Sequence, residues 1–184
     1  IDESADEYLE FLKKVVSADT RILEHGRLGH EDNGQRIIRA FLEQSGAQVD
    51  SFQPTYEQMA FCPEVNPDHD YEGRHNVVGV FSGTGGGRSL LFNGHIDTVD
   101  FGDVNQWTRG PLEPYVEDGK LVGRGACDMK GGLCASLMAM KALRDCGVRL
   151  KGDVLYESVI DEEGGGNGTL ACCAKGYRAD AAII

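Results

Sequence analysis

The stretch DVLYESVIDEEGGG (residues 153–166) is an apolar run that ends abruptly in three acidic residues and three glycines. A short apolar run bounded by turn residues is typical of a strand that is buried on both faces of a sheet. We therefore predict a buried strand over residues 153–160, with the acidic residues at the point where it leaves the sheet.

Helical patterns lie on both sides of this strand. Apolar residues recur at helical spacing over residues 129–146, and a shorter helix is expected over residues 168–175. Nearer the N-terminus, amphipathic helices are predicted over residues 4–17, with Ser4 as the N-cap, and over residues 33–44.

Extended patterns cover residues 48–53, 76–81, 89–92 and 179–184. The runs at 76–81 and 89–92 are separated by glycine-rich turn residues, which predicts that they pair as an antiparallel hairpin. Residues 54–73 carry three prolines and little periodicity, so we expect an irregular connection without a catalytic residue. Strands that alternate with helices indicate a mixed, mostly parallel α/β sheet flanked by helices, and such folds bind ligands at the ends of their strands.

The composition limits the class of protein. The chain has 184 residues, of which 41% are hydrophobic, and this suits one domain or one part of a larger domain. Its 30 acidic and 18 basic residues give a net charge of −12, which argues against nucleic acid and anionic lipid as partners. No apolar stretch approaches a membrane span, and residues 1–4 lack the features of a signal peptide. We therefore expect a cytoplasmic protein without a membrane partner.

Cysteine and glycine usage limits the cofactors. The six cysteines are irregularly spaced, which favours reduced and mostly buried thiols. Without a Cys-x-x-Cys pair, a metal must be held by histidine and carboxylates. The glycine-rich residues 83–87 are not followed by the lysine-serine or lysine-threonine pair that ends a phosphate-binding loop, so we expect no nucleotide cofactor.

The first of three polar clusters is Gly94-His95-Ile96-Asp97, directly after the apolar run that ends near Phe92. A histidine that binds a metal usually donates its other ring N–H to a carboxylate; Asp97 is a candidate for that role, or it orients the histidine in some other way. A His-x-Asp pair at a strand end is also typical of ordinary hydrogen bonding.

The second cluster is GRGACDMKGG (residues 123–132), in which Asp128 stands among four glycines before the predicted helix. A carboxylate can bridge two cations about 3.5–4 Å apart, which is the spacing in two-metal hydrolases. Asp128 is the candidate for that position, although aspartate is also a favoured helix N-cap.

The third cluster is Asp161-Glu162-Glu163. Three consecutive acids repel one another unless a cation or solvent screens them. One carboxylate can bind a metal while its neighbour, on the other side of an extended chain, acts as a general base on a water molecule. An ordinary solvated acidic turn is the alternative.

With these clusters in this order and spacing, the chain resembles the metallopeptidase and amidohydrolase family that includes acetylornithine deacetylase, succinyl-diaminopimelate desuccinylase, aminoacylase and bacterial glutamate carboxypeptidase. The matching segments are residues 94–99, 123–132 and 161–164, and residues 107–111 and 118–121 resemble the segment that joins the first two. The resemblance covers nearly the whole chain.

The resemblance implies a hydrolase with two Zn²⁺ ions, with Co²⁺ or Mn²⁺ as alternatives because histidine and carboxylate ligands do not select among these ions. It implies that His95 binds one metal, Glu163 the other, and Asp128 both. Glu162 is then the general base, and Asp97 supports the histidine. It also implies a cis peptide bond after Asp128.

The same resemblance implies that residues 1–184 are the N-terminal part of a zinc-exopeptidase-like catalytic domain. Further metal ligands and a lid or dimerisation domain are expected outside this chain, with a homodimer formed through that domain, and we expect these residues alone to be inactive. The substrate is expected to be an N-acyl amino acid, as in the deacetylases and desuccinylases. A dipeptidase or carboxypeptidase activity is one alternative, and a catalytically inactive binding module is another.

Overall fold

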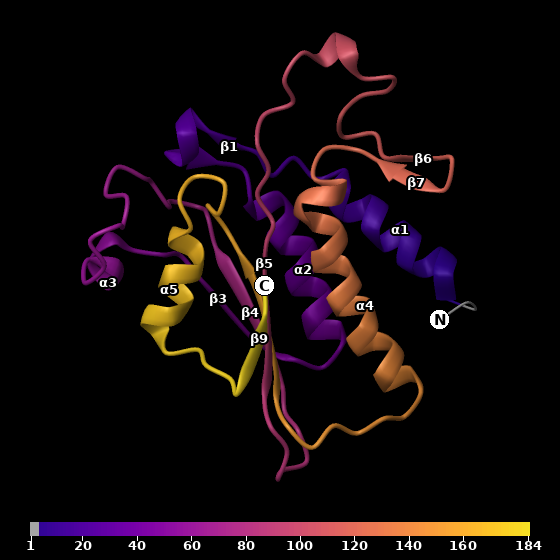
Figure 1. The fold of residues 1–184 in the computed structure, drawn as a ribbon, viewed down its shortest axis with the longest axis vertical. Coiled ribbons are helices and arrows are strands. Elements are labelled where there is room, and N and C mark those ends of the chain that lie inside the picture. The colour runs from indigo at the N-terminus through magenta and orange to yellow at the C-terminus, as the bar shows by residue number, and fades with distance from the viewer. Residues whose placement is uncertain (1–3) are drawn as a thin grey trace.

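The computed structural model describes residues 4–184, and a five-stranded sheet lies at its centre (Figure 1). In spatial order the strands are β3 (Gln48–Phe52), β4 (Asn76–Phe81), β8 (Val154–Val159), β5 (Leu90–His95) and β9 (Ala181–Ile183). Outside this sheet, β1 (Ile22–Leu23) pairs with β2 (Leu28–Gly29), and β6 (Tyr115–Glu117) pairs with β7 (Lys120–Val122). The expectation about a signal peptide rests largely on residues 1–3, which lie outside the described part of the chain.

Four of the five strands of the main sheet run in the same direction. Strand β5 is parallel to its neighbours β8 and β9, whereas β4 is antiparallel to both β3 and β8. Every residue of β8 is buried, as predicted for this stretch. The mixed, mostly parallel sheet predicted from the sequence is therefore confirmed.

The predicted hairpin of β4 and β5 is wrong, because β8 lies between these two strands. The glycine-rich connection makes two hydrogen bonds with the segment that leads into β8. The amide of Thr84 donates to the carbonyl of Leu150, and the amide of Gly85 donates to the carbonyl of Lys151, both at 2.9 Å. At Gly83 a Cβ atom would lie 2.4 Å from the carbonyl oxygen of Lys151, so the lack of a side chain permits this approach. The glycines thus make room for the entry of β8 instead of closing a tight turn.

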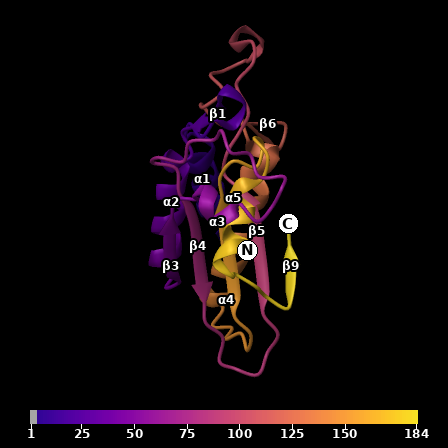
Figure 2. The same cartoon turned by 90° about the vertical axis from the view of Figure 1, so that its left-hand side faces the viewer.

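Helices cover both faces of the sheet. One face carries α1 (Ala5–Val16), α2 (Asp32–Gln44) and α4 (Gly131–Asp145), and the other carries α3 (Tyr56–Met59) and α5 (Asn167–Lys175) (Figure 1). Short 3-10 segments occur at η2 (Glu24–Gly26) and η3 (Val104–Gln106), and η4 (Ala126–Lys130) is a π-type turn before α4. Figure 2 views the sheet from the side of α5, with β3 at one edge and β9 at the other.

The main core lies under the larger helical layer, where α2 and α4 place apolar side chains against the sheet. It includes Ile38, Leu42, Val77, Leu133, Leu137 and Tyr156. Val78, next to Val77, faces the opposite way and joins a smaller cluster with Val159 and Cys172 of α5, because successive side chains of a strand point to opposite faces.

Several local predictions need correction. Ser4 precedes α1 but its side chain makes no capping hydrogen bond. Helix α4 begins at Gly131 and not at Met129, because Asp128 and Met129 have non-helical backbone angles.

Only two of the six cysteines, Cys134 and Cys172, are buried; three are exposed because they lie in η4 or near the ends of α4 and α5. Within residues 4–184, no helix has both the length and the apolarity to cross a membrane.

Candidate metal centre

The candidate site lies at the edge of the sheet where β5 and β8 end. His95 is the last residue of β5 and pairs with Val159, the last residue of β8. Parallel neighbours end at the same edge, so the acidic residues after β8 come close to His95. The turn η4, which contacts β5, brings Asp128 to the same place. His95, Asp128 and Glu163 each offer one ligand atom, and these three atoms all lie within 4.8 Å of one another.

The ring of His95 is oriented by its surroundings. The side chain is buried, and Nδ1 lies 2.9 Å from the main-chain carbonyl of Asp97, which can only accept a hydrogen bond. Nδ1 therefore carries a proton. Nε2 lies 3.0 Å from Oδ1 of Asp128 and 3.7 Å from Oε2 of Glu162, so the lone pair of the neutral ring is directed at the position that a cation between these groups would take. This is the tautomer that a histidine needs to bind a metal through Nε2.

Asp97 contacts His95 in a different way from the one expected. The carbonyl of Asp97, and not its carboxylate, accepts the hydrogen bond from the ring; the nearest carboxylate oxygen is 3.6 Å from Nδ1. Its other oxygen accepts a hydrogen bond from the amide of Glu163 (3.0 Å). Asp97 is fully buried, and this burial raises the pKa of its carboxyl above the usual range. It thus joins the end of β5 to the acidic turn.

Asp128 is not the N-cap of the following helix. The N-cap position of α4 is Lys130, and the side chain of Asp128 is 77% exposed beside His95. The peptide bond between Asp128 and Met129 is cis, as the resemblance implied. An exposed carboxylate that faces a histidine is available to a metal.

The acidic turn is more than a solvated surface feature. Glu162 is exposed and Glu163 is partly buried, but Asp161 is fully buried. Burial raises the pKa of Glu163, and the nearby charges of Asp128 and Glu162 raise it further. Burial lowers the pKa of His95, but the surrounding carboxylates, led by that of Asp97, more than offset this effect and raise it. A cation placed among these carboxylates relieves their repulsion, so the donor set fits a divalent metal.

One group of residues near the site was not predicted. Asp161 accepts hydrogen bonds from the Tyr71 hydroxyl (2.8 Å) and faces Nδ1 of His69 (2.8 Å). Both residues come from the connection 54–73, in which no catalytic residue was expected. His69 and Tyr71 contact the acidic turn, but neither forms a hydrogen bond with His95, Asp128 or Glu163. Nothing in their spacing indicates this contact, because it joins residues about ninety positions apart.

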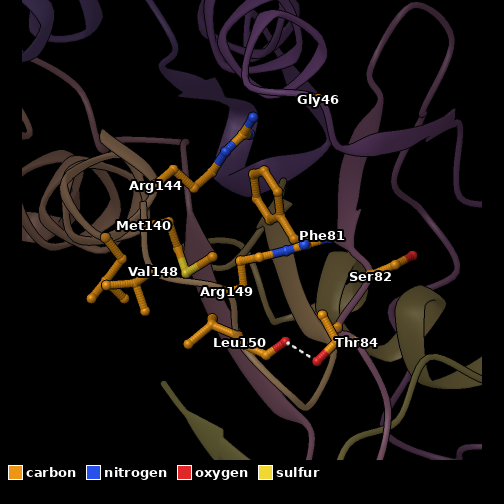
Figure 3. A pocket seen from close by; sticks show the side chains of 11 residues that line it. Gly46, Phe81, Ser82, Thr84, Met140, Arg144, Val148, Arg149 and Leu150 are labelled. Carbon is orange, nitrogen blue, oxygen red and sulfur yellow. Dashed lines mark hydrogen bonds between the residues drawn. The ribbon is translucent and has the colours of Figure 1, made fainter. Parts of the chain in front are cut away.

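A cavity lies at the opposite end of the sheet, and Figure 3 shows the side chains that line it. It has a volume of about 570 Å³ and is lined at the sheet by Phe81, which pairs with the first residue of β8. Arg144 and Arg149 also line it, but none of its lining residues is a histidine or an acid. It therefore offers no metal ligand and is separate from the candidate centre.

Residues 91–184, which include all three polar clusters, match the protein family described as Peptidase family M20/M25/M40. The chain belongs to this family. The resemblance proposed from the three motifs is therefore confirmed, and the match begins inside β5 and covers the whole candidate site of this M20/M25/M40 chain.

Two curated proteins are similar to this M20/M25/M40 chain over its whole length. Both are named N-formyl-4-amino-5-aminomethyl-2-methylpyrimidine deformylase; the one from Bacillus subtilis is 33% identical and the one from Halalkalibacterium halodurans 36% identical. The chain spans 39% of the length of each of these relatives.

Solved structures share the fold. Human carnosine dipeptidase 1 superposes with a TM-score of 0.68 and 22% identity, covering 86% of this chain and 32% of its own. The dipeptidase Dug1p of Saccharomyces cerevisiae superposes with a TM-score of 0.70 and 18% identity, covering 90% of this chain and 34% of its own. At these identities the likeness establishes the architecture of the M20/M25/M40 chain and not its substrate.

Proposed function

We propose that the protein hydrolyses the amide bond of a small N-acyl compound at a divalent-metal centre to which His95, Asp128 and Glu163 contribute ligands. The observation that carries this proposal is the convergence of these three side chains, from three separate segments, on one point at the rim of the sheet. The orientation of His95, whose Nε2 faces the carboxylates of Asp128 and Glu162, supports it.

The proposed roles follow from exposure and contacts. A bound divalent ion supplies a Lewis acid for the amide carbonyl and lowers the pKa of a water molecule. Glu162 has an exposed carboxylate 3.7 Å from the His95 ring, so it can take a proton from the attacking water and pass it to the leaving amine. Asp97 keeps the His95 ring and the amide of Glu163 in place. Two Zn²⁺ ions remain the proposed metals, with Co²⁺ or Mn²⁺ as alternatives.

The proposed substrate is an acylated amine. The names of the two deformylases describe removal of a formyl group from nitrogen, which is amide cleavage without a peptide substrate. This supports deacylation over a dipeptidase or carboxypeptidase activity, which is the second candidate. N-acetyl and N-succinyl amino acids, N-formyl amines and dipeptides are therefore the panel on which the protein is to be assayed.

Variants of the complete protein test the assignment of roles. Glu162→Gln is expected to remove most of kcat while the metal content stays at the wild-type value, because this side chain moves a proton and does not hold the metal. Asp128→Asn and Glu163→Gln are expected to lower the metal content itself. Arg39→Gln, on the exposed side of α2, serves as the control. Unchanged turnover in Glu162→Gln would refute its role as the base.

The extent of the catalytic unit stays a prediction. We propose that further ligands and a lid or dimerisation domain complete the centre outside residues 1–184, and that the complete protein is a dimer. Zinc content and amide hydrolysis compared between residues 1–184 and the complete protein test this proposal. Full activity of residues 1–184 would contradict it. A complete protein that binds metal but cleaves none of the panel would favour the inactive binding module.

A further inference from the structure

The turn that carries Glu162 and Glu163 starts at a residue with an unusual conformation. Asp161 has a φ angle of 62°, in the left-handed region that disfavours residues with a Cβ atom. Glycine adopts this conformation freely, and aspartate adopts it more often than most other residues when contacts hold its side chain. The carboxylate of Asp161 is fully buried and makes such contacts.

His69 and Tyr71 contact this carboxylate and Asn167 holds Tyr71 in place; we call these three side chains the Asp161 clamp. Nη2 of Arg74 lies 3.7 Å from the other carboxylate oxygen, Oδ1. Oδ2 of Asp161 accepts hydrogen bonds from the Tyr71 hydroxyl and from Nδ1 of His69, both at 2.8 Å. The side-chain Nδ2 of Asn66 donates to Nε2 of His69 (2.8 Å), so the proton of a neutral His69 ring lies on Nδ1 and points to Asp161. Asn167 donates to the Tyr71 oxygen (2.6 Å).

The clamp holds both ends of the acidic turn. Asp161 is its first residue, and Asn167 is the first residue of α5, which follows the turn. Between them, the amide of Gly166 donates to the carbonyl of Asp161 (2.8 Å). The amide of Glu163 donates to Asp97 (3.0 Å), which fixes the middle of the turn to the end of β5. These hydrogen bonds restrict the backbone conformation of the segment that carries Glu162 and Glu163.

Two glycines make room for the carboxylate. A Cβ atom at Gly164 would lie 2.2 Å from Oδ1 of Asp161, and one at Gly26 would lie 2.8 Å from the same atom. Gly164 does not have a positive φ, so its role here is to allow close approach and not to supply a special backbone conformation. The turn is therefore shaped around the Asp161 side chain.

We propose that Asp161 is a positioning residue of the metal centre, and that its clamped carboxylate sets the direction in which Glu162 and Glu163 leave the turn toward His95. This inference rests on the proposed function, because positioning Glu162 and Glu163 affects catalysis only if these residues act on a metal or a substrate. Groups that position metal ligands usually change metal affinity or activity by about 10–100-fold when they are removed.

Three variants of the complete protein test the proposal. Asp161→Gly removes the anchor but suits the left-handed backbone. Asp161→Asn keeps an oxygen for the clamp, and asparagine also tolerates this backbone region. Asp118→Gly is the matched control, because Asp118 also has a positive φ (50°) but is exposed in the turn between β6 and β7. For each variant, zinc affinity, kcat, KM and the visible absorption of the Co²⁺-loaded protein are measured per folded molecule.

In Asp161→Gly, zinc affinity and kcat are expected to fall by roughly 10–100-fold and the Co²⁺ spectrum to change. KM is expected to change little, because Asp161 is fully buried. Asp161→Asn should recover most of the loss, and Asp118→Gly should match the wild type. A purely structural role would lower stability and leave kcat per folded molecule unchanged, so unchanged kcat and zinc affinity in Asp161→Gly would overturn the proposal.

Two further measurements keep the test decisive. If Asp161→Gly does not fold, Gly164→Ala is measured instead, because it places a methyl group 2.2 Å from Oδ1 of Asp161 and 2.9 Å from Cα of Gly26. The same losses are expected, and wild-type values would overturn the proposal. Hydrogen exchange at the amide of Glu163 reports the turn even in a protein that binds no metal, and it should rise in Asp161→Gly. A wild-type protein without metal and without amide hydrolysis refutes the proposed function, whereas unchanged exchange at Glu163 overturns the positioning role.

Discussion

Replacement of Arg74 by Met tests how strongly one buried ion pair stabilises this fold. Arg74 is 2% exposed and Glu31 is fully buried. Nε of Arg74 donates to both carboxylate oxygens of Glu31, at 3.2 and 3.0 Å. Nη1 donates to the carbonyls of Gly26 and Asp70, both at 2.9 Å. The guanidinium therefore joins the ribbon of β1 and β2, the start of α2 and the segment before β4.

The expected loss follows from the charge that remains. Methionine fills most of the volume but leaves the Glu31 carboxylate without a partner, and it also removes the cation that lies 3.7 Å from Oδ1 of Asp161. Breaking a buried ion pair in this way costs about 3–5 kcal/mol in the free energy of unfolding. Arg39→Met is the control, because Arg39 pairs with Glu43 on the surface of α2 (2.8 Å) and such pairs contribute about 0.3–0.5 kcal/mol. The measurement is urea unfolding of the complete protein at pH 7, followed by circular dichroism.

The pH dependence gives a second, independent check. Burial raises the pKa of Glu31 above its model-compound value of 4.5, and Arg74 opposes this rise. Without Arg74 the pKa rises further. A carboxyl whose pKa is raised in the folded state destabilises that state as the pH rises above the unfolded pKa. From pH 4.5 up to the raised pKa of Glu31 in the wild type, both proteins lose stability equally, so the penalty of Arg74→Met should grow only as the pH rises above that wild-type pKa. A loss no larger than that of Arg39→Met, or one that does not change with pH, would refute this reasoning.

Three further outcomes are expected. Leu137→Ala removes a fully buried side chain of α4 and should lower the free energy of unfolding by about 2–5 kcal/mol; a loss below that of Arg39→Met would contradict the packing of this helix. The hydrogen bond from Arg21 lowers the pKa of Asp19 to about 2 from 3.8, so its stabilisation is complete above pH 4 and is lost as the pH falls through 2. The destabilisation by Asp19→Asn in urea titrations should shrink over that window, and a constant difference would argue against the pair. Dialysis against a chelator should abolish amide hydrolysis while the far-ultraviolet circular dichroism stays the same, and added Zn²⁺ or Co²⁺ should restore it; hydrolysis that survives complete metal removal would contradict the metal centre.

Much of the secondary structure was predictable from neighbours along the chain. The pattern of residues 153–160 predicted a buried strand, and β8 is buried over its whole length because it lies at the centre of the sheet. Helix α2 begins one residue before its predicted start. Helix α4 begins two residues after its predicted start, because periodicity does not detect the turn at Asp128 and Met129.

The candidate ligands were also accessible from sequence, since each of His95, Asp128 and Glu163 stands in a short cluster with its own glycines or acids. Their meeting was expected from the placement of such clusters at strand ends, and the structure brings all three together. Their roles as ligands stay predictions. What holds His95 was not predictable: the main-chain carbonyl of Asp97, which has no signal in the sequence, replaces the expected carboxylate.

The sequence by itself determined the periodic elements and the residues with the chemistry of a metal site, because periodicity, turn residues and motifs are properties of adjacent positions. Only the tertiary structure decided that β8 enters between β4 and β5, and that His69 and Tyr71 reach Asp161. These contacts join segments up to 92 residues apart. A hydrogen bond across such a separation depends on how the whole sheet is ordered, and no local pattern of the chain encodes that order.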